Sequence, residues 1–389
     1  MTGAPQSVEN LVIGGGPAGA MAALRLAAAR REVLLVEKEP AAHDKVCGEF
    51  LSHEAVAYLN QVGISPLDLG AKSIRDVRLS TGNQIVHSPL PFPALSLSRR
   101  VLDAALQARA EQTGCRVLRG TSVQSLAKSG QGWTASLSDG QPLHASAVFL
   151  AAGKHDLRGY ARPSGKQSDL IGFKLHWRLA PAQTAALQDF MDLFLFPGGY
   201  GGLALIENDA ANLCLVVRRS ILRPLDGWPE LLASILQGNR HLRRLLDDST
   251  PLWSRPLAIS PIPYGYLAQK SNGLWPLGDQ AAVIPSFTGD GISIALHSAA
   301  LATHMFLSGA TANDYLRALR SQLTRSVTLA TWLSRAAVTR LGRTCAPAAL
   351  TVIPGAMRWV AASTRIPHAS LVETDFQIRN AGPAAQLGI

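Results

Sequence analysis

Apolar positions in the first forty residues fall into two short runs that flank a helical pattern. Residues 10–13 and 33–36 are continuous apolar runs, which predict two buried strands. Between them, residues 20–30 are rich in Ala and Leu, which favours a helix. A strand, a helix and a second strand within about thirty residues predict a parallel βαβ unit of the kind that binds nucleotides.

The middle of the chain follows a different pattern, with short apolar runs separated by turn residues. Thr81-Gly82-Asn83 lies at the centre of a predicted hairpin over residues 74–88, and a helical segment is predicted over residues 228–246. Four further strands are predicted over residues 170–179, 192–196, 203–207 and 212–218. This block predicts an antiparallel sheet.

The last third of the chain reads as helices. A helix is predicted over residues 292–307, and further helices follow residue 313. Between residues 326 and 365 apolar positions alternate with Arg335, Arg340, Arg343, Arg358 and Arg365. Such a segment could rest on a membrane or contact an acidic carrier protein. It could equally cover the rest of the protein and present arginines to solvent.

Composition indicates a globular chain. Its 389 residues suffice for two or three domains, and 47% hydrophobic against 16% charged residues argues against disorder. The formal net charge of +10 favours an anionic cofactor, an acidic carrier, nucleic acid or a membrane surface, or is simply a basic exterior. No nucleic-acid partner is expected.

The four cysteines, at positions 47, 115, 214 and 345, form no CxxC pair and no Cys/His cluster. With no signal peptide at the N-terminus, this predicts a reduced cytoplasmic protein, in contact with a membrane at most peripherally, and without structural zinc or disulfides. No metal site is expected. The longest late segment without charge, residues 344–357, is too short to span a bilayer.

The segment between the first strand and the first helix carries a GxGxxG motif. Gly14 permits a tight turn, Gly16 lets the backbone approach a pyrophosphate, and Gly19 lets helix and strand pack closely. The helix N-terminus offers free N–H groups to phosphates. Glu37, at the end of the second strand, is placed to accept hydrogen bonds from a ribose. We also assign Pro17, Ala18 and Lys38 to this dinucleotide site. The loop alone does not distinguish FAD from NAD.

A second motif lies far along the chain, at residues 274–292. A short apolar run ends at Gly278-Asp279, where the carboxylate is placed to bind a ribityl hydroxyl. Gly289 and Gly291 open the following helix, so that backbone N–H groups can approach the pyrimidine side of a flavin. Pro285 and Ile292 belong to the same predicted site.

Together the two motifs resemble those of FAD-dependent oxidoreductases of the para-hydroxybenzoate hydroxylase fold, a group that includes aromatic monooxygenases and geranylgeranyl reductases. Arg99, three residues before the Leu102-Asp103 pair, adds to the resemblance, which covers roughly residues 8–310. The resemblance implies FAD as the cofactor, a flavin contact for Arg99 and an adenine contact for the strand containing Val123.

The resemblance implies an α/β fold in which an antiparallel-sheet substrate domain is inserted into a Rossmann-type FAD-binding domain, followed by a C-terminal helical segment. We expect residues 1–73, 92–165 and 260–312 to form the FAD-binding domain, residues 74–91 and 166–259 the substrate domain, and residues 313–389 the helical segment. The substrate pocket is expected where the antiparallel sheet faces the flavin. Candidates to line it, with a plain core role as the alternative, are Trp177, Phe194, Phe196 and Tyr200.

Lys45-Val-Cys47-Gly-Glu49 is the most distinctive local sequence, and geranylgeranyl reductases carry a similar KxCG segment near the flavin. Cys47 is a candidate to contact the flavin, to shape the pocket or to donate a proton. The alternative is a small apolar residue packed beneath the flavin ring. Glu49, in an exposed loop or at a helix start, is a second candidate catalytic residue.

One departure from the hydroxylase pattern concerns the electron donor. Hydroxylases of this fold usually carry an Asp-Gly pair after the strand that ends here at Ala151, whereas this chain has Ala152-Gly153. The departure puts direct use of NADPH by the usual route in doubt, although Lys154, His155 and Arg158 could form a phosphate-binding cluster. The Trp-x-Trp-x-Ile-Pro signature of flavin halogenases is absent, which argues against halogenation.

Three functions remain open. The first, which we favour, is a monooxygenase that hydroxylates a phenolic or polyketide-like secondary metabolite through a flavin C4a-hydroperoxide, with NAD(P)H as a possible electron donor. The second is a reductase that delivers hydride to a C=C bond of a prenyl or lipidic chain, which Cys47 and the Ala152 departure support. The third is a flavin electron carrier that acts on a partner protein.

Overall fold

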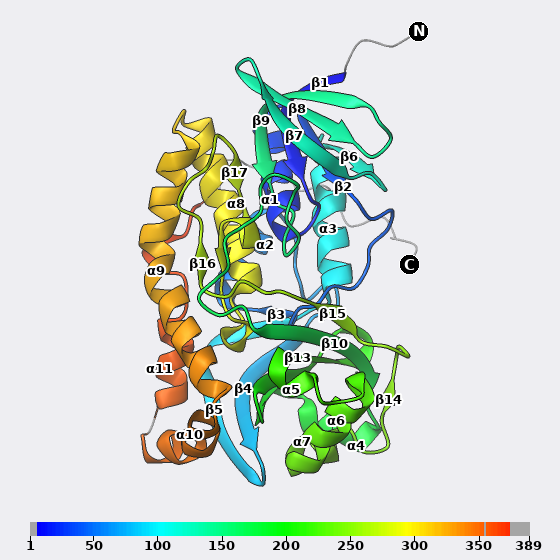
Figure 1. Ribbon diagram of the computed structural model, residues 1–389, viewed down its shortest axis with the longest axis vertical. Coiled ribbons are helices and arrows are strands. Elements are labelled where there is room, and N and C mark those ends of the chain that lie inside the picture. The colour runs from blue at the N-terminus through cyan, green and yellow to red at the C-terminus, as the bar shows by residue number, and fades with distance from the viewer. Residues whose placement is uncertain (1–5, 354, 374–389) are drawn as a thin grey trace.

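Two β-sheets and a set of helices between and beside them make up the protein in a computed structural model, which describes residues 6–353 and 355–373 (Figure 1). One sheet lies at each end of the molecule, and the long helix α9 runs along the side of the space between them (Figure 1). The last part of the predicted C-terminal helical segment, residues 374–389, lies outside the described residues.

The first sheet contains the predicted βαβ unit. Its order is β6-β2-β1-β9-β8-β7, with β17 paired to β9, and strands β6, β2, β1, β9 and β17 run parallel. Its strands are β1 (Gln6–Ile13), β2 (Val33–Glu37), β6 (Arg116–Arg119), β7 (Val123–Ser129), β8 (Gly132–Leu137), β9 (Pro142–Leu150) and β17 (Trp275–Pro276). The apolar runs near the N-terminus are therefore buried parallel strands, as predicted.

The second sheet has the order β14-β10-β13-β12-β11-β4-β5-β3, with β15 paired to β10. It is antiparallel except between β4 and β11. Its strands are β3 (Phe50–Leu51), β4 (Lys72–Thr81), β5 (Gln84–Ser96), β10 (Leu170–Arg178), β11 (Asp189–Phe196), β12 (Gly199–Leu205), β13 (Ala210–Arg218), β14 (Thr250–Pro251) and β15 (Leu257–Ile259). The hairpin predicted around Gly82 is β4–β5. A separate two-stranded sheet pairs β16 (Tyr266–Leu267) with β18 (Ala282–Val283).

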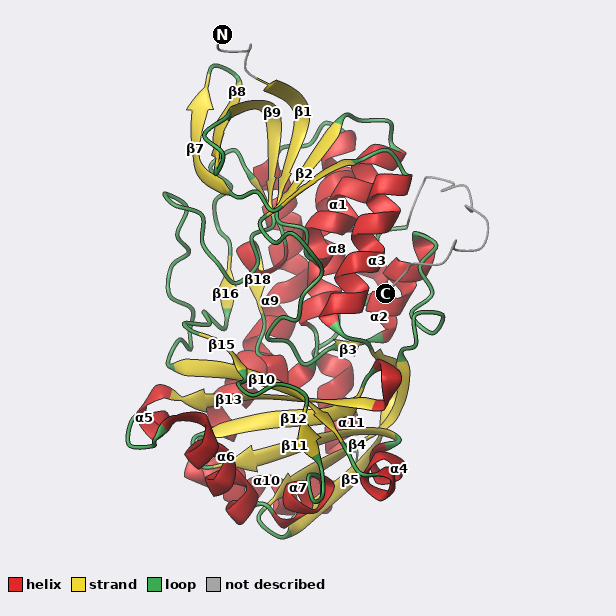
Figure 2. Cartoon of the chain, turned by 90° about the vertical axis from the view of Figure 1, so that its right-hand side faces the viewer, coloured by secondary structure: helices red, strands yellow, loops and turns green. Residues whose placement is uncertain are grey.

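Helices fill the space between the sheets, and others pack on the outer face of the second sheet (Figure 2). Helix α1 packs against α3 and α8 in the largest hydrophobic cluster. The helices are α1 (Pro17–Ala28), α2 (His53–Gln61), α3 (Arg99–Gln112), α4 (Pro181–Leu187), α5 (Arg219–Leu222), α6 (Gly227–Gly238), α7 (Arg240–Leu245), α8 (Gly291–Leu307), α9 (Ala312–Ala337), α10 (Arg340–Val352) and α11 (Ala356–Ser363). Short 3-10 turns are η1 (Glu207–Asp209), η2 (Gly278–Gln280), η3 (Ser286–Thr288) and η4 (His368–Ser370).

The segment predicted as one helical stretch over residues 228–246 is two helices, α6 and α7. Asn239 separates them with an extended backbone, and its side-chain oxygen accepts a hydrogen bond of 2.9 Å from the amide of Leu242. Asn is a strong N-cap residue, so it starts a new helix rather than continuing the old one.

The second sheet has two chemically different faces, because successive side chains of a strand point to opposite sides. On β10, Phe173, Leu175 and Trp177 belong to a hydrophobic cluster with α6 and α7. Lys174 and His176 therefore point to the other face, towards the first sheet. That inner face is where the candidate site lies.

Candidate functional site

The GxGxxG loop packs as its glycines predict. A Cβ atom on Gly19 would lie 1.8 Å from the carbonyl oxygen of Gly14, and one on Gly14 would lie 2.4 Å from the oxygen of Ala151. Helix and strand can approach this closely only because both positions lack side chains. At the N-terminus of α1, Gly16 is the N-cap and no side chain caps the helix. A phosphate at this helix N-terminus would bind free backbone amides. Ala18 and Gly19 provide them, because Pro17 has no N–H group.

Glu37 lies beside this loop at the end of β2. Its carboxylate accepts a hydrogen bond of 2.6 Å from the amide of Gly15 and another of 3.1 Å from the amide of Glu39. Gln107 of α3 donates to the carbonyl oxygen of Gly15 over 2.7 Å. Glu37 is buried, whereas the adjacent Lys38 is exposed. The predicted ribose acceptor is thus held next to the phosphate loop.

Arg99 also reaches the loop, since its Nη2 would lie 3.2 Å from a Cβ on Gly16. Its guanidinium donates two hydrogen bonds of 2.8 Å to Asp103, which also pairs with Lys45 over 3.0 Å. Burial lowers the pKa of Arg99, but Asp103 outweighs it and the net pKa is raised. The ion pair keeps a cation fixed beside the dinucleotide loop. Asp103 belongs to the pair that carried the family resemblance but had no predicted role, and Gln107 was not predicted as part of this site.

Residues of the late motif, at positions 274–292, also lie beside the GxGxxG loop. Gly278 approaches α1 so closely that its Cβ would lie 3.1 Å from the Cβ of Ala18, and its amide donates to Ser298 over 2.8 Å. Asp279 is half-buried in η2. The structure therefore brings the two predicted motifs together, although 259 residues separate Gly19 from Gly278.

The second part of the late motif is held by the C-terminal region. Pro285 precedes η3, and Gly289, with φ of +76°, ends it before α8 begins at Gly291. Asp290 between the glycines pairs with Arg365 over 2.7 Å, and Arg365 also donates to the carbonyl oxygen of Thr288. Burial raises the pKa of Asp290 to about 7, although Arg365 opposes that rise.

The Cys47–Glu49 turn lies between the two halves of the molecule. Glu49 is fully buried, which corrects its predicted place in an exposed loop, and its φ of +58° is unusual for a residue with a side chain. Its carboxylate accepts a hydrogen bond of 2.7 Å from the amide of Arg99. Asn212 of β13 donates to the carbonyl oxygen of Cys47 over 3.1 Å. The turn is therefore fixed by the N-terminus of α3 on one side and by β13 of the second sheet on the other.

Two polar side chains of β10 complete the environment of Glu49. Lys174 forms an ion pair with one oxygen of Glu49, and His176 Nε2 lies 3.0 Å from the other. Asp44 lies 3.3 Å from Lys174 Nζ. Lys174 and His176 were not predicted as site residues. Their pattern could have indicated a site, because they are two polar residues two positions apart in an otherwise apolar strand.

Asp44, Glu49 and His176 could together offer ligand atoms to a metal ion, since these atoms lie within 4.8 Å of one another. The ammonium group of Lys174, however, already contacts both carboxylates. A divalent cation there would face a positive charge at close range. The cluster therefore has the charge pattern of a buried ion-pair network rather than of a metal centre.

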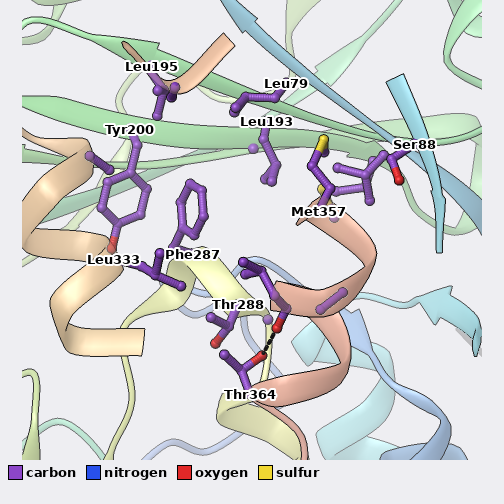
Figure 3. A pocket seen from close by; sticks show the side chains of 18 of the residues that line it. Leu79, Ser88, Leu193, Leu195, Tyr200, Phe287, Thr288, Leu333, Met357 and Thr364 are labelled. Carbon is purple, nitrogen blue, oxygen red and sulfur yellow. Dashed lines mark hydrogen bonds between the residues drawn. The ribbon is translucent and has the colours of Figure 1, made fainter. Parts of the chain in front are cut away.

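An apolar cavity of about 430 Å³ opens on the inner face of the second sheet (Figure 3). Gly48 and Gly289 line one part of it, so the cavity reaches both the Cys47–Glu49 turn and the late glycine motif. Tyr200, Leu193 and Leu195 extend into it from the sheet, and Met357 faces them from α11 (Figure 3). The cavity is thus enclosed by the sheet on one side and the C-terminal helices on the other.

Of the four aromatic residues predicted to line the pocket, the structure places one there. Tyr200 lines the cavity, where its hydroxyl lies 3.0 Å from that of Ser334 and burial raises its pKa to about 12. Trp177, Phe194 and Phe196 point to the opposite face, into the cluster with α6 and α7. For these three the alternative, a plain core role, holds, because the side-chain alternation of the strands places them on the outer face.

Three further candidate residues, Val123, Lys154 and His155, lie near the parts of the site described above. Val123 is buried at the start of β7, two residues after Thr121, whose amide donates to the carbonyl oxygen of Glu37. Lys154 donates to the carbonyl oxygen of Val46 over 2.9 Å, next to the Cys47–Glu49 turn. His155 has a lowered pKa because of burial and of the nearby cations Lys38, Arg162 and Lys154.

The residues present fit a dinucleotide with a flavin: an uncapped helix N-terminus at Gly16, an acidic acceptor at Glu37 and a fixed cation at Arg99. Residues 7–152 match the family model described as an FAD binding domain. These residues are an FAD-binding domain. Its cofactor is FAD, as the two glycine motifs predicted.

Known proteins resemble the chain beyond this domain. The menaquinone reductase of Mycobacterium tuberculosis is 27% identical over 77% of this chain and 76% of its own length. A geranylgeranyl bacteriochlorophyll reductase-like protein from Thermoplasma acidophilum has the same fold, with a TM-score of 0.73 at 19% identity over 94% of this chain and 95% of that protein. A probable FAD-dependent monooxygenase from Pseudomonas aeruginosa superposes with a TM-score of 0.69 at 18% identity, over 87% and 99% of the two chains.

These likenesses confirm the predicted fold, that of the FAD-dependent monooxygenases and the geranylgeranyl reductase-like proteins. The chain is an FAD-dependent oxidoreductase.

Proposed function

We propose that this protein reduces a carbon–carbon double bond in an isoprenoid or other lipidic chain. The observation that carries the proposal is the cavity between the second sheet and helices α9 to α11, which reaches Gly48 and Gly289 and has almost entirely apolar walls. A hydrocarbon chain gains about 0.8 kcal/mol for each CH₂ that it buries there. A polar substrate would lose hydrogen bonds to water with few partners to replace them.

The relatives support the same proposal. The curated relative described above is a menaquinone reductase, and one structural neighbour is described as geranylgeranyl bacteriochlorophyll reductase-like. Menaquinone and a geranylgeranyl chain are both largely apolar. This support changes the preference expressed from the sequence, where a hydroxylase stood first. The departure at Ala152 and the KxCG segment favour the reductase as well.

Each part of the site has a proposed role. Bound FAD, in its reduced form, would supply a hydride to one carbon of the double bond, and NAD(P)H is the proposed source of its electrons. The Cys47 thiol is the proposed donor of the proton to the other carbon, which completes the addition of two hydrogen atoms. Glu49 is proposed as a positioning residue, because its carboxylate contacts Lys174, His176 and the Arg99 amide.

The cofactor contacts are proposed at the positions that the motifs indicated. Gly14, Gly16, Ala18 and Gly19 would receive the pyrophosphate, Glu37 the ribose and Val123 the adenine. Arg99, Cys47, Asp279, Gly289 and Gly291 would contact the flavin half. We further propose the domain division at the boundaries predicted from the sequence, so that the first sheet belongs to the FAD-binding domain and most of the second to the substrate domain. Strand β3, the first two residues of β4 and the end of β5 then belong to the FAD-binding domain although they pair in the second sheet.

A monooxygenase is the second candidate, favoured by the fold shared with the probable monooxygenase from Pseudomonas aeruginosa. One experiment separates the two. Protein reduced with dithionite under argon is mixed with a geranylgeranyl-chain lipid, and the product is analysed by mass spectrometry. A gain of two hydrogens without oxygen supports the reductase. A product that forms only with oxygen and gains one oxygen atom contradicts it.

A further inference from the structure

The segment of residues 315–372 carries only basic charges. Between residues 315 and 372 the sequence contains eight arginines and no Lys, Asp or Glu. Arg317 pairs with Asp314 and Arg365 with Asp290, both acids lying outside that segment. Arg335, Arg340 and Arg358 are exposed, and Arg343 is half-buried. This segment therefore exposes positive charge and contains no acidic residue of its own.

Large apolar side chains are exposed in this same segment. Among the described residues, eight large hydrophobic side chains are exposed, and five of them lie between positions 332 and 359. They are Trp332 (67%), Leu341 (75%), Val352 (77%), Ile353 (57%) and Trp359 (58%). Exposed apolar groups concentrated on one part of a surface mark a site of interaction.

These side chains come from the end of α9 and from α10 and α11, which gather at one end of the molecule (Figure 1). No charged residue occurs between Thr344 and Met357, so the later part of α10 is uncharged, while Arg340 and Arg343 lie in its first turn and Arg358 lies in α11. No single described helix is long and apolar enough to cross a bilayer. Residues 340–352 and 356–370 would be apolar enough only as a pair, and that pair is bent by 109°.

The inner sides of the same helices line the cavity. Leu333 and Ala336 of α9, Cys345 and Leu350 of α10, and Met357 of α11 all contribute to its wall. Trp332 lines the cavity and is also 67% exposed, so the cavity reaches the molecular surface at this residue. An apolar molecule at that surface would therefore lie next to an apolar interior.

We propose that α10, α11 and Trp332 form a docking surface for a bilayer that contains anionic phospholipids. The exposed apolar side chains would enter the boundary between headgroups and acyl chains, and the arginines would contact lipid phosphates. Arginine side chains suit this position because their stems pack on apolar surface while the charged ends reach outwards. Entry of substrate from the bilayer past Trp332 rests on the proposed function, but the docking itself does not.

An acidic protein is the competing occupant, and the exposed apolar residues decide against it. Charge pairing alone would need the arginines but not two exposed tryptophans beside an apolar helix face. An amphipathic helix with a basic flank and Trp and Leu on its apolar side is the pattern of interfacial membrane helices.

The test is co-sedimentation of the FAD-loaded protein with vesicles, either of phosphatidylcholine alone or of phosphatidylcholine with phosphatidylglycerol. The wild type should bind the anionic vesicles, and binding should weaken as salt is raised. The double variant Leu341→Gln/Val352→Gln should bind them at least about tenfold more weakly, because two apolar side chains no longer enter the lipid. Arg340→Gln/Arg343→Gln should lose about tenfold or more on anionic vesicles alone.

Matched controls carry the same changes elsewhere on the surface. Leu67→Gln/Leu252→Gln alters two exposed leucines, and Arg243→Gln/Arg244→Gln alters two exposed arginines of α7. Both should bind like the wild type. Retained flavin absorbance shows that each variant is folded.

Three outcomes would overturn the proposal: no binding of the wild type to anionic vesicles, equal losses in test and control variants, or losses in the arginine variant without any in the apolar variant. The last outcome would indicate an acidic partner instead. Vesicle binding needs no turnover, so protein that docks but reduces no double bond would contradict the proposed function and leave the docking surface in place.

Discussion

Glu49 and Lys174 form an ion pair in which neither side chain is exposed to solvent, although 125 residues separate them. The pair joins the Cys47–Glu49 turn to strand β10. It therefore connects the FAD-binding half of the molecule to the sheet that carries the apolar cavity. His176 and the amide of Arg99 bind the same carboxylate, so the turn is held with Glu49 in the left-handed conformation. Such a conformation costs about 1 kcal/mol or more and persists only where the surroundings fix it.

Replacing Lys174 with Met should destabilise the protein by about 3–5 kcal/mol, because Glu49 would remain buried without its cation. Denaturant unfolding followed by circular dichroism measures the change. Lys72→Met is the matched control, since Lys72 pairs with Asp209 at the surface. That variant should lose less than about 1 kcal/mol. Equal losses in the two variants would contradict the importance assigned to the buried pair.

Gly16→Val should prevent binding of FAD, because a branched side chain would occupy the space where the pyrophosphate approaches the N-terminus of α1. A Cβ at this position already lies 3.2 Å from Arg99. The yellow flavin absorbance of the purified protein provides the measurement. Gly238→Val is the control, since a Cβ there meets nothing within 4 Å. Full FAD occupancy in the Gly16→Val protein would refute the assignment of the loop.

Cys47→Ala should slow the oxidation of reduced protein by a lipidic substrate about a hundredfold, as expected when a proton donor is removed. FAD should still bind, because the contacts proposed for Gly16, Glu37 and Arg99 are untouched, and the flavin absorbance of each sample checks this. Stopped-flow absorbance under argon follows the reaction. Cys115→Ala, which alters a buried cysteine of the hydrophobic cluster around α1 and not of the cavity wall, should react at the rate of the wild type. Unchanged kinetics in the Cys47 variant would remove the thiol from the proposed reaction.

Asp290→Asn should alter how stability depends on pH. Burial raises the pKa of Asp290 from its usual 3.8 to about 7, against the opposing effects of Arg365; Glu54 adds to the rise. A raised pKa means that this group stabilises the fold fully below about pH 3.8 and loses that contribution as pH rises to about 7. The Asn variant should therefore gain stability relative to the wild type between pH 4 and pH 7, by roughly 3–4 kcal/mol, and gain no more above pH 7.

Urea unfolding across this pH range measures the difference. Asp314→Asn should show the opposite trend at lower pH, because hydrogen bonds from Thr311 lower the pKa of Asp314 to about 2. The stabilising effect of Asp314 is complete above about pH 3.8 and is lost as pH falls from there to about 2. A constant difference between wild type and the Asp290 variant from pH 4 to pH 8 would show that Asp290 is ionised throughout.

The cofactor site could be predicted because its parts are local. The motif glycines, Gly14, Gly16 and Gly19, lie in one turn between a strand and a helix. Their spacing alone therefore predicts where the backbone closely approaches another backbone segment or a phosphate. Gly278 and Gly289 carry the same kind of local information. The alternation of β10 also predicted its strand correctly, but alternation does not say which face of a sheet looks inwards. Trp177 was therefore open to either a pocket or a core role, and the structure places it in the outer core.

The sequence by itself determined the FAD-binding loop, the two kinds of sheet and the basic helical end, because each follows from the order of neighbouring residues. Only the tertiary structure decided that Glu49 is buried against Lys174 and His176, and that the cavity is walled by the second sheet and the C-terminal helices. Both depend on contacts between segments more than a hundred residues apart. The energy of such contacts comes from burial and charge pairing across space, and no local pattern specifies which distant strand or helix will supply the partner.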